Sequence, residues 1–134
     1  MVQREGVSPN AARAQGGQRR APRLAVELPG TLSGRTRHEV LVLDLSVTGC
    51  LARVATAPAR GAILDLTVEL EGETLAGKVR VTGSYLDGSM AVDAPRRHLC
   101  GLEFLALHHA EEARLRRFLD DEKRRRRGAD TPLR

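Results

Sequence analysis

Hydrophobic and polar residues alternate along most of the middle of the chain, which is typical of strands that bury one face. The clearest case is 63–70, where Leu64, Leu66, Val68 and Leu70 share one side. Similar short segments recur at intervals of about ten residues, joined by turns. We expect strands at residues 24–28, 40–43, 50–54, 63–70, 74–81 and 99–105. This pattern predicts an all-β barrel or sandwich.

Glycine, proline and polar clusters mark where we expect the strands to stop. Residues 29–30 (Pro-Gly) are expected to end the first strand, and 71–73 (Glu-Gly-Glu) to form a hairpin turn. A polar connection over 83–95, which includes Tyr85, is expected before the last strand.

After residue 107 the period of the pattern changes. Three apolar residues repeat at i, i+3 and i+4, namely Leu115, Phe118 and Leu119. They predict a helix over 108–127 with a narrow apolar stripe, because Glu111, one turn earlier on the same face, is charged. We expect this helix to lie on the barrel and to end at Gly128. The basic run 124–127 suits the negative end of the helix macrodipole.

A chain of 134 residues is long enough for one domain with a core of its own and charged ends. Residues 1–17 hold few sizeable apolar side chains, so we expect a disordered tail there, followed by a barrel domain over 18–107. Residues 128–134 are expected to form a second disordered tail after the helix. No apolar run reaches the ~18 residues of a membrane span, and the start lacks a secretory signal. These features indicate a cytoplasmic protein.

The net charge of +5 is concentrated at the two ends, while the middle is nearly balanced. A nucleic-acid-binding domain more often carries its basic excess in the body of the fold. The aromatic content of 2% also argues against binding single strands by base stacking.

The sequence shows no catalytic or metal-binding arrangement. Cys50 and Cys100 each lie in an apolar segment, and with His98 they supply too few ligands for a structural zinc site. We therefore expect buried, reduced thiols and no metal. No Ser-His-Asp set, paired carboxylates or phosphate-binding glycine loop is evident, so we expect no enzyme.

Two short motifs carry the candidate chemistry. The loop motif, Asp44-Leu45-Ser46-Val47-Thr48-Gly49, separates two expected strands and by itself predicts an Asx or Ser turn. Its Asp can accept hydrogen bonds, its Ser can donate or accept, and its Gly can take a positive φ or let a ligand approach the backbone. The arginine motif, Arg19 to Arg23, lies upstream, where Pro22 favours an extended lead-in to the first strand.

Together, Arg-x-x-x-Arg followed by Asp-x-Ser-x-x-Gly resembles the two-part signature of PilZ domains, bacterial receptors for the second messenger cyclic di-GMP. Residues 101–104 (Gly-Leu-Glu-Phe) also resemble the closing strand of that family, and the resemblance covers roughly residues 17–120. It implies a six-stranded antiparallel β-barrel with a C-terminal α-helix, in agreement with the strand pattern. The ligand would be cyclic di-GMP, with no cofactor.

The resemblance also implies roles for individual residues. A guanidinium can bond phosphate bidentately, pair with guanine or stack on it, and a carboxylate can accept from the guanine N1 and N2 hydrogens. Phosphate and base contacts would fall to Arg19 and Arg23, with Arg20 as a third candidate. A guanine would be held on the barrel by Asp44, Ser46 and Gly49. The lead-in would reorder around the ligand and signal to a separate, unidentified partner. Gln18, which precedes the arginine motif, leaves the number of bound ligands open.

Two alternatives come from other classes of protein. One is a PilZ-like protein-interaction module that binds no nucleotide, although the complete motifs count against it. The other is an RNA- or DNA-binding barrel that uses 124–127 and the N-terminal arginines, for which affinity would fall steeply with salt and ignore base identity.

Overall fold

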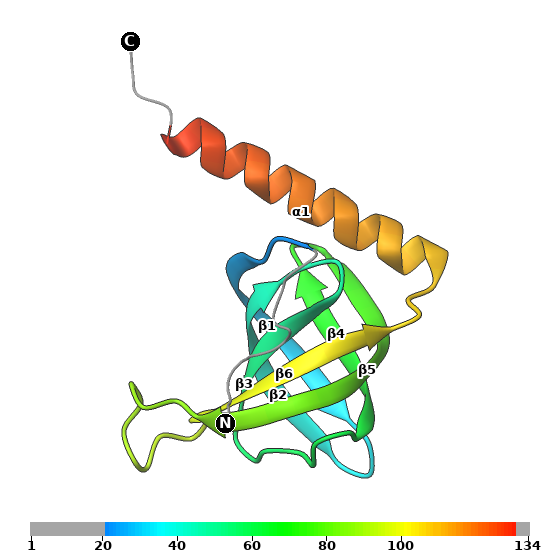
Figure 1. The fold of residues 1–134 in the computed structure, drawn as a ribbon. Helices are drawn as coiled ribbons and strands as arrows, with labels where there is room; N and C mark the ends of the chain where they lie inside the picture. Colours follow the sequence, from blue (N-terminus) through cyan, green and yellow to red (C-terminus); the bar gives the residue numbers. More distant parts are fainter. Residues whose placement is uncertain (1–20, 131–134) are drawn as a thin grey trace.

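The computed structural model describes residues 21–130, which form a closed antiparallel barrel and a helix (Figure 1). The strands are β1 (Leu24–Ser33), β2 (Arg37–Leu45), β3 (Gly49–Val54), β4 (Ile63–Leu70), β5 (Glu73–Leu86) and β6 (His98–Leu105), and the helix is α1 (His109–Asp130). The strand order around the barrel is β1-β2-β3-β6-β5-β4. The predicted six-stranded antiparallel barrel with a C-terminal helix is confirmed.

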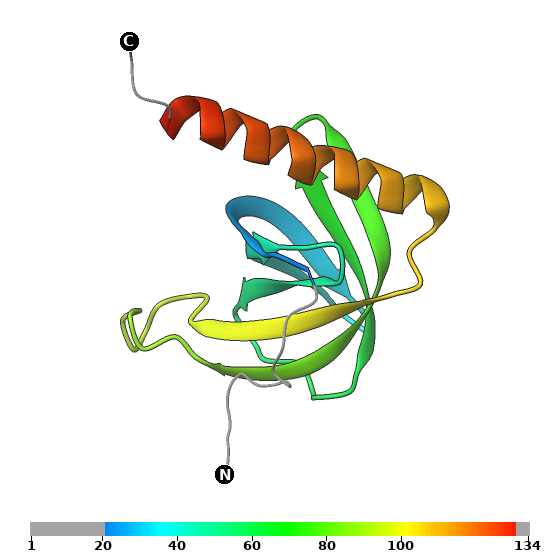
Figure 2. The ribbon, with the colours of Figure 1, turned by 45° about the horizontal axis from the view of Figure 1, so that its top comes forward.

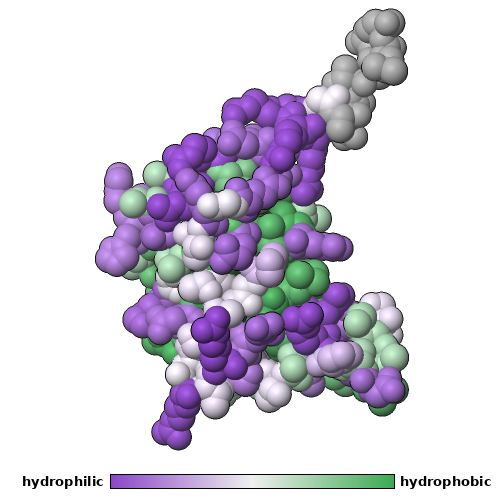
Figure 3. All heavy atoms as spheres, turned by 180° about the vertical axis from the view of Figure 1, so that it is seen from behind, coloured by the Kyte–Doolittle hydropathy of each residue, from purple (hydrophilic) through white to green (hydrophobic). Residues whose placement is uncertain are grey.

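The core is formed by the inward residues of all six strands and by the apolar stripe of α1. Val42 and Val68 are 0% exposed inside the barrel, and the same cluster includes Leu115, Phe118 and Leu119 of α1. The helix lies across one end of the barrel, as Figures 1 and 2 both show. Burial of its narrow stripe there removes apolar surface from water, which stabilises the fold. Polar residues cover the outer side of α1 (Figure 3).

The expectation that residues 29–30 end the first strand is wrong, because β1 continues through them to Ser33. Gly30 pairs with Val40 of β2 and with Val68 of β4, and a Cβ at Gly30 would lie 2.5 Å from the carbonyl oxygen of Thr67. The glycine therefore permits close approach of β4. The β1–β4 pairing begins only at Gly30, so Pro29 lies at the boundary of that ladder, where a missing N–H is tolerated.

The prediction of a polar connection over 83–95 is also partly wrong, because β5 extends to Leu86 and so includes the first residues of that range. Its last residues pair with β6, with Gly83 opposite Gly101 and Tyr85 opposite Leu99. A register shift between Val81 and Gly83 interrupts the alternation that marked the strand in the sequence. The loop that follows β5 projects away from the barrel (Figure 1).

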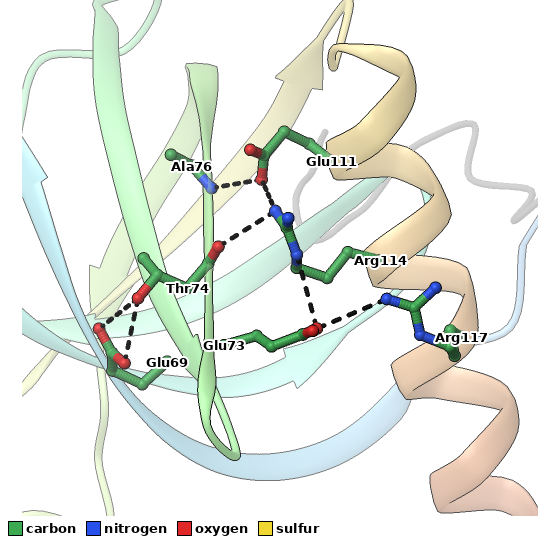
Figure 4. Close-up of polar contacts among 7 residues, drawn as sticks. All are labelled: Glu69, Glu73, Thr74, Ala76, Glu111, Arg114 and Arg117. Atoms are coloured by element: carbon green, nitrogen blue, oxygen red, sulfur yellow. Dashed lines mark hydrogen bonds and ion pairs between the residues drawn. The ribbon is translucent and has the colours of Figure 1, made fainter.

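Helix α1 supplies hydrogen-bonding partners for an unpaired edge of β5 (Figure 4). The pairing of β5 with β6 begins at Lys78, so the preceding residues lack a strand neighbour on that side. The Ala76 amide donates to Oε1 of Glu111 at 3.0 Å, and Arg114 donates to the Thr74 carbonyl at 3.4 Å and to Glu111 at 2.9 Å. The charged residue on the apolar face of the helix is thus explained by backbone groups that need partners.

The predicted helix end at Gly128 is wrong, since α1 continues to Asp130. A glycine costs about 1 kcal/mol in a helix interior, which is too little to end a helix that other contacts hold. Arg125 bonds Glu71 at 2.9 Å, and Arg126 donates to the carbonyl of Ala25 at 2.6 Å. Within residues 21–130, no helix is both long and apolar enough to cross a membrane.

Candidate functional site

The two sequence motifs meet where β1 begins and β2 ends. Nη1 of Arg23 donates to Oδ1 of Asp44 at 2.7 Å, and the two side chains are 32% and 23% exposed. Ala25 lies opposite Asp44 in the β1–β2 register, which brings the residue just before β1 within reach of the carboxylate. Arg19 and Arg20 lie outside the described residues. The structure therefore joins Arg23, from the arginine motif, to Asp44, from the loop motif.

An irregularity in β2 turns the carboxylate of Asp44 outward. Residues two apart on a regular strand share a face, so Asp44 would point into the core with Val42. The β2–β3 register shifts between Val42 and Asp44, and the next buried residue is Leu45. A bulge of this kind re-aims a side chain. Asp44 is consequently available at the surface, while Val42 and Leu45 on either side of it stay buried.

Ser46 is fully buried, and its hydroxyl bonds within the loop motif. The oxygen accepts from the Thr48 amide at 3.1 Å, and the hydroxyl donates to the Gly49 carbonyl at 3.3 Å. The Thr48 hydroxyl lies 3.0 Å away as a further partner. Ser46 thus closes a turn, as the loop motif by itself predicted. It also fixes the loop that follows Asp44.

Gly49 serves the packing of the barrel. Of the two roles that the sequence left open for this glycine, a positive φ is not used, because Gly49 is absent from the residues with positive φ. A Cβ at this position would clash with the carbonyl oxygen of Leu102 on β6. The adjoining Phe104 amide donates to the Thr48 carbonyl at 2.9 Å, which keeps β6 close to the loop. The close backbone approach that this glycine permits is therefore that of β6.

Tyr85 belongs to the surroundings of this site, although its sequence context predicted a polar connection between strands. Its side chain is 54% exposed. Its pKa is raised, first by partial burial and then by the charges of Asp44 and Asp87, while the charge of Arg23 acts in the opposite direction. The tyrosine therefore lies within electrostatic reach of the Arg23–Asp44 pair. The sequence did contain a signal for this residue, because Tyr85 is the one tyrosine of the chain and stands in an otherwise polar segment.

The thiols take no part in this surface. Cys50 and Cys100 are both free and buried, as predicted. Burial raises the pKa of Cys100 to about 12 and raises the pKa of Cys50 as well, so both stay protonated at neutral pH. In the described part of the chain, no three His, Cys, Asp or Glu side chains come together as a metal site.

A closed six-stranded barrel with a helix across one end, and an arginine paired to the aspartate of an Asp-x-Ser-x-x-Gly loop, define a PilZ-type domain. The family model described as PilZ domain matches residues 17–121. The chain belongs to the PilZ domain family.

Solved structures share this fold at low sequence identity. The complex of MrkH from K. pneumoniae with c-di-GMP matches with a TM-score of 0.70 at 17% identity, over 84% of this chain and 56% of that one. The PilZ domain of Escherichia coli YcgR with c-di-GMP matches with a TM-score of 0.66 at 17% identity, over 86% and 99%. The Bacillus subtilis inhibitor of motility, MotI/DgrA, matches with a TM-score of 0.66 at 14% identity, over 79% and 51%.

The chain thus spans about half the length of the MotI/DgrA and MrkH chains that it matches. A search of curated proteins gave no match.

Proposed function

We propose that this chain is a receptor for cyclic di-GMP that binds the ligand at the Arg23–Asp44 site. The observation that carries the proposal is the 2.7 Å ion pair between the two motifs at one surface of the barrel. Membership of the PilZ family supports it, as do the YcgR and MrkH structures, both of which contain c-di-GMP.

The ion pair gives a chemical route to binding. Arg23 and Asp44 satisfy one another in this structure, and each offers what a guanine nucleotide needs. A guanidinium fork matches the oxygens of a phosphate or the O6 and N7 edge of guanine, and a carboxylate accepts from guanine N1 and N2. Binding would exchange the ion pair for these two sets of contacts. Arg19 and Arg20 would add further guanidinium groups, and Ser46 and Gly49 would hold the loop that presents Asp44.

The same exchange provides a signal. Movement of Arg23 would displace the segment that enters β1, where the Ala25 carbonyl accepts from Arg126 of α1 at 2.6 Å. The displacement caused by ligand binding would then affect the C-terminal end of α1 as well as the N-terminal segment. A separate protein would recognise the change. The receptor would carry out no catalytic step, and the cytoplasmic location expected from the sequence remains a prediction.

Calorimetric titration with cyclic di-GMP at physiological salt tests the proposal. We expect saturable binding of cyclic di-GMP and much weaker binding of cyclic di-AMP. Adenine lacks the N1–H and N2–H groups that would donate hydrogen bonds to the carboxylate of Asp44. Absence of heat with a sample whose folding is verified by circular dichroism would contradict the proposal and favour a nucleotide-free interaction module.

A nucleic-acid-binding barrel is disfavoured by the contacts of the basic run on α1. Arg124 pairs with Asp121, Arg125 pairs with Glu71 and Glu122, and Arg126 also pairs with Glu122. These arginines are engaged by carboxylates of the same chain, so they form no bare positive surface for a phosphate backbone. Equal, strongly salt-dependent affinity for unrelated polyanions would restore that alternative.

A further inference from the structure

The last part of β5 has an open edge on the side away from β6. The ladder between β4 and β5 ends at Arg80, and two further bonds reach the next residue, Val81, from the chain just before β4. Strand β5 continues to Leu86 and stays paired with β6. Residues 82–86 therefore extend past β4, and Figures 1 and 2 both show β5 and β6 running on together toward the projecting loop.

The hydrogen-bond pattern shows which backbone groups face the open side. The Asp87 amide donates to the Arg97 carbonyl at 2.7 Å, so these two residues continue the β5–β6 ladder as a hydrogen-bonded pair. Such pairs alternate along an antiparallel ladder, which directs the N–H and C=O groups of Ser84 and Leu86 away from β6. Among the hydrogen bonds of residues 21–130, none engages these groups on that side. They are ready to pair with another strand.

The residues of this edge do not guard it against pairing. Natural sheets commonly protect an exposed edge with a lysine, a proline or a covering segment. Residues 82–86 (Thr-Gly-Ser-Tyr-Leu) contain no lysine, no proline and no carboxylate. A register shift lies just before Gly83, but from there to Leu86 the pairing with β6 is regular. The edge is therefore a regular strand that can accept a neighbour.

Exposed apolar side chains gather at both ends of this edge. Among residues 21–130 the large apolar side chains that are exposed are Ile63, Tyr85, Leu86 and Val92, at 55%, 54%, 54% and 83%. Ile63 begins β4, where the covered part of β5 ends, and the other three lie at the end of β5 or in the loop that follows. Arg97 donates to the Val92 carbonyl at 3.2 Å, which ties that loop to the start of β6. Apolar side chains that gather in this way mark an interaction surface.

The charges at this edge do not oppose association with an identical edge. Its one ionisable side chain is Tyr85, whose pKa is raised, chiefly by partial burial, so the phenol is neutral at neutral pH. The adjoining Asp87 is paired with Arg53 at 2.9 Å. Like charges on two copies of a protein would repel one another, and this surface lacks that barrier. A second copy of the chain therefore fits the edge electrostatically.

We propose that two copies of the chain form a symmetric dimer by antiparallel pairing of residues 82–86. With Tyr85 on the two-fold axis, Ser84 of one copy lies opposite Leu86 of the other, and each such pair exchanges its free N–H and C=O groups. The two Tyr85 rings face each other as a non-hydrogen-bonded pair, in which side chains lie closest. The antiparallel direction also brings the Ile63 end of one copy to the loop end of the other. Since both edges are then covered, association stops at the dimer.

The mass of the full chain in solution, without nucleotide, tests the dimer. Light scattering during size-exclusion chromatography over a concentration series should show a mass that rises from that of one chain to that of two. The mass of one chain at every concentration would overturn the inference. That result would leave the proposed function standing, because the dimer is measured without nucleotide and nucleotide binding is measured separately by calorimetry.

Substitutions at the edge locate the interface. Ser84→Pro removes an N–H that faces the open side, and Leu86→Lys places a charge on each edge. We expect both variants to show the mass of one chain at concentrations where the wild type is a dimer, with an unchanged circular dichroism spectrum. Ala113→Lys, which adds the same charge at an exposed position of α1, is the matched control and should stay dimeric. A dimer that survives Leu86→Lys would overturn the inference, whether or not Ser84→Pro folds.

A cysteine on the two-fold axis tests the register. In the proposed dimer the two copies of Tyr85→Cys are directly opposed, and both native cysteines are buried, so the new thiol is the accessible one. Mild oxidation should give a disulfide-linked dimer on a non-reducing gel. Thr82→Cys is the control, because its two copies lie at opposite ends of the paired stretch and should link far more slowly. No cross-link in Tyr85→Cys, or equal rates in the two variants, would overturn the inference.

Discussion

The guanidinium of Arg23 donates to the carboxylate of Asp44 at 2.7 Å and so joins the residues before β1 to the end of β2. Both groups are partly exposed, at 32% and 23%. An ion pair in this position adds little to folding stability, typically about 0 to 1 kcal/mol. Under the proposed function its role lies in binding, because each side chain orients the other at a surface where a ligand with both phosphate and guanine would replace the pair.

Arg23→Ala should abolish most binding without unfolding the barrel. Loss of a charge-assisted contact is expected to remove about 1.5 to 3 kcal/mol, a rise in Kd of roughly ten- to a hundredfold. Calorimetry measures the affinity, and thermal unfolding checks the fold. Arg60→Ala, which removes an exposed arginine from the β3–β4 connection, is the control and should bind normally. Normal binding by Arg23→Ala together with lost binding by Asp44→Ala would show that the proposed role of Arg23 in binding is wrong.

Gly49→Ala should destabilise the barrel. The new Cβ would clash with the Leu102 carbonyl oxygen, and backbone yields less readily than a side chain. We expect a loss of about 3 kcal/mol in the free energy of unfolding, the upper end for overpacking. Urea denaturation measures it. Gly88→Ala, where a Cβ meets nothing within 4 Å, should leave stability near the wild-type value. Equal stability of the two variants would contradict the packing role of Gly49.

The ionisation of Tyr85 should report the state of the Arg23–Asp44 pair. Asp44→Asn removes a charge that raises the pKa of this tyrosine, so its pKa should fall, whereas Arg23→Ala should raise it further. Tyrosinate absorbance during an alkaline titration measures both shifts at the only tyrosine. Asp65→Asn is the control, because its carboxylate pairs with Lys78 at 2.7 Å. An unchanged pKa in both variants would mean that the ring lies away from the pair.

The contact of Glu111 with β5 should make folding stability sensitive to acid. The Ala76 amide, followed by Arg114, lowers the pKa of Glu111 below its ordinary value of 4.5. A carboxyl whose pKa is lower in the folded state stabilises the fold fully above that ordinary value, and this stabilisation is lost as pH falls through the folded-state pKa.

Glu111→Gln keeps an oxygen that can accept from the Ala76 amide but cannot titrate. Its stability should therefore decline less steeply in acid than that of the wild type, as measured by denaturant unfolding across a pH series. Glu39→Gln removes an exposed carboxylate of β2 and controls for the loss of one negative charge. Parallel decline of Glu111→Gln and the wild type would exclude the helix contact as the source of acid sensitivity.

The amino-acid sequence by itself determined the architecture. Alternation with period two, as in Leu66, Val68 and Leu70, fixes which face of a strand is buried, and the helical spacing of Leu115, Phe118 and Leu119 fixes the stripe that α1 buries. These are local periodicities that need no knowledge of strand partners. The two motifs likewise predicted the family, because their residue types and spacing are chemical features of the chain.

Only the tertiary structure decided what depends on a neighbouring strand. Continuation of β1 through Pro29 and Gly30 depends on where β4 begins to pair, and continuation of β5 to Tyr85 depends on β6. The outward direction of Asp44 comes from a register shift against β3. Pairing partners and bulges are set by contacts between segments far apart in the chain, so the pattern within one segment cannot reveal them.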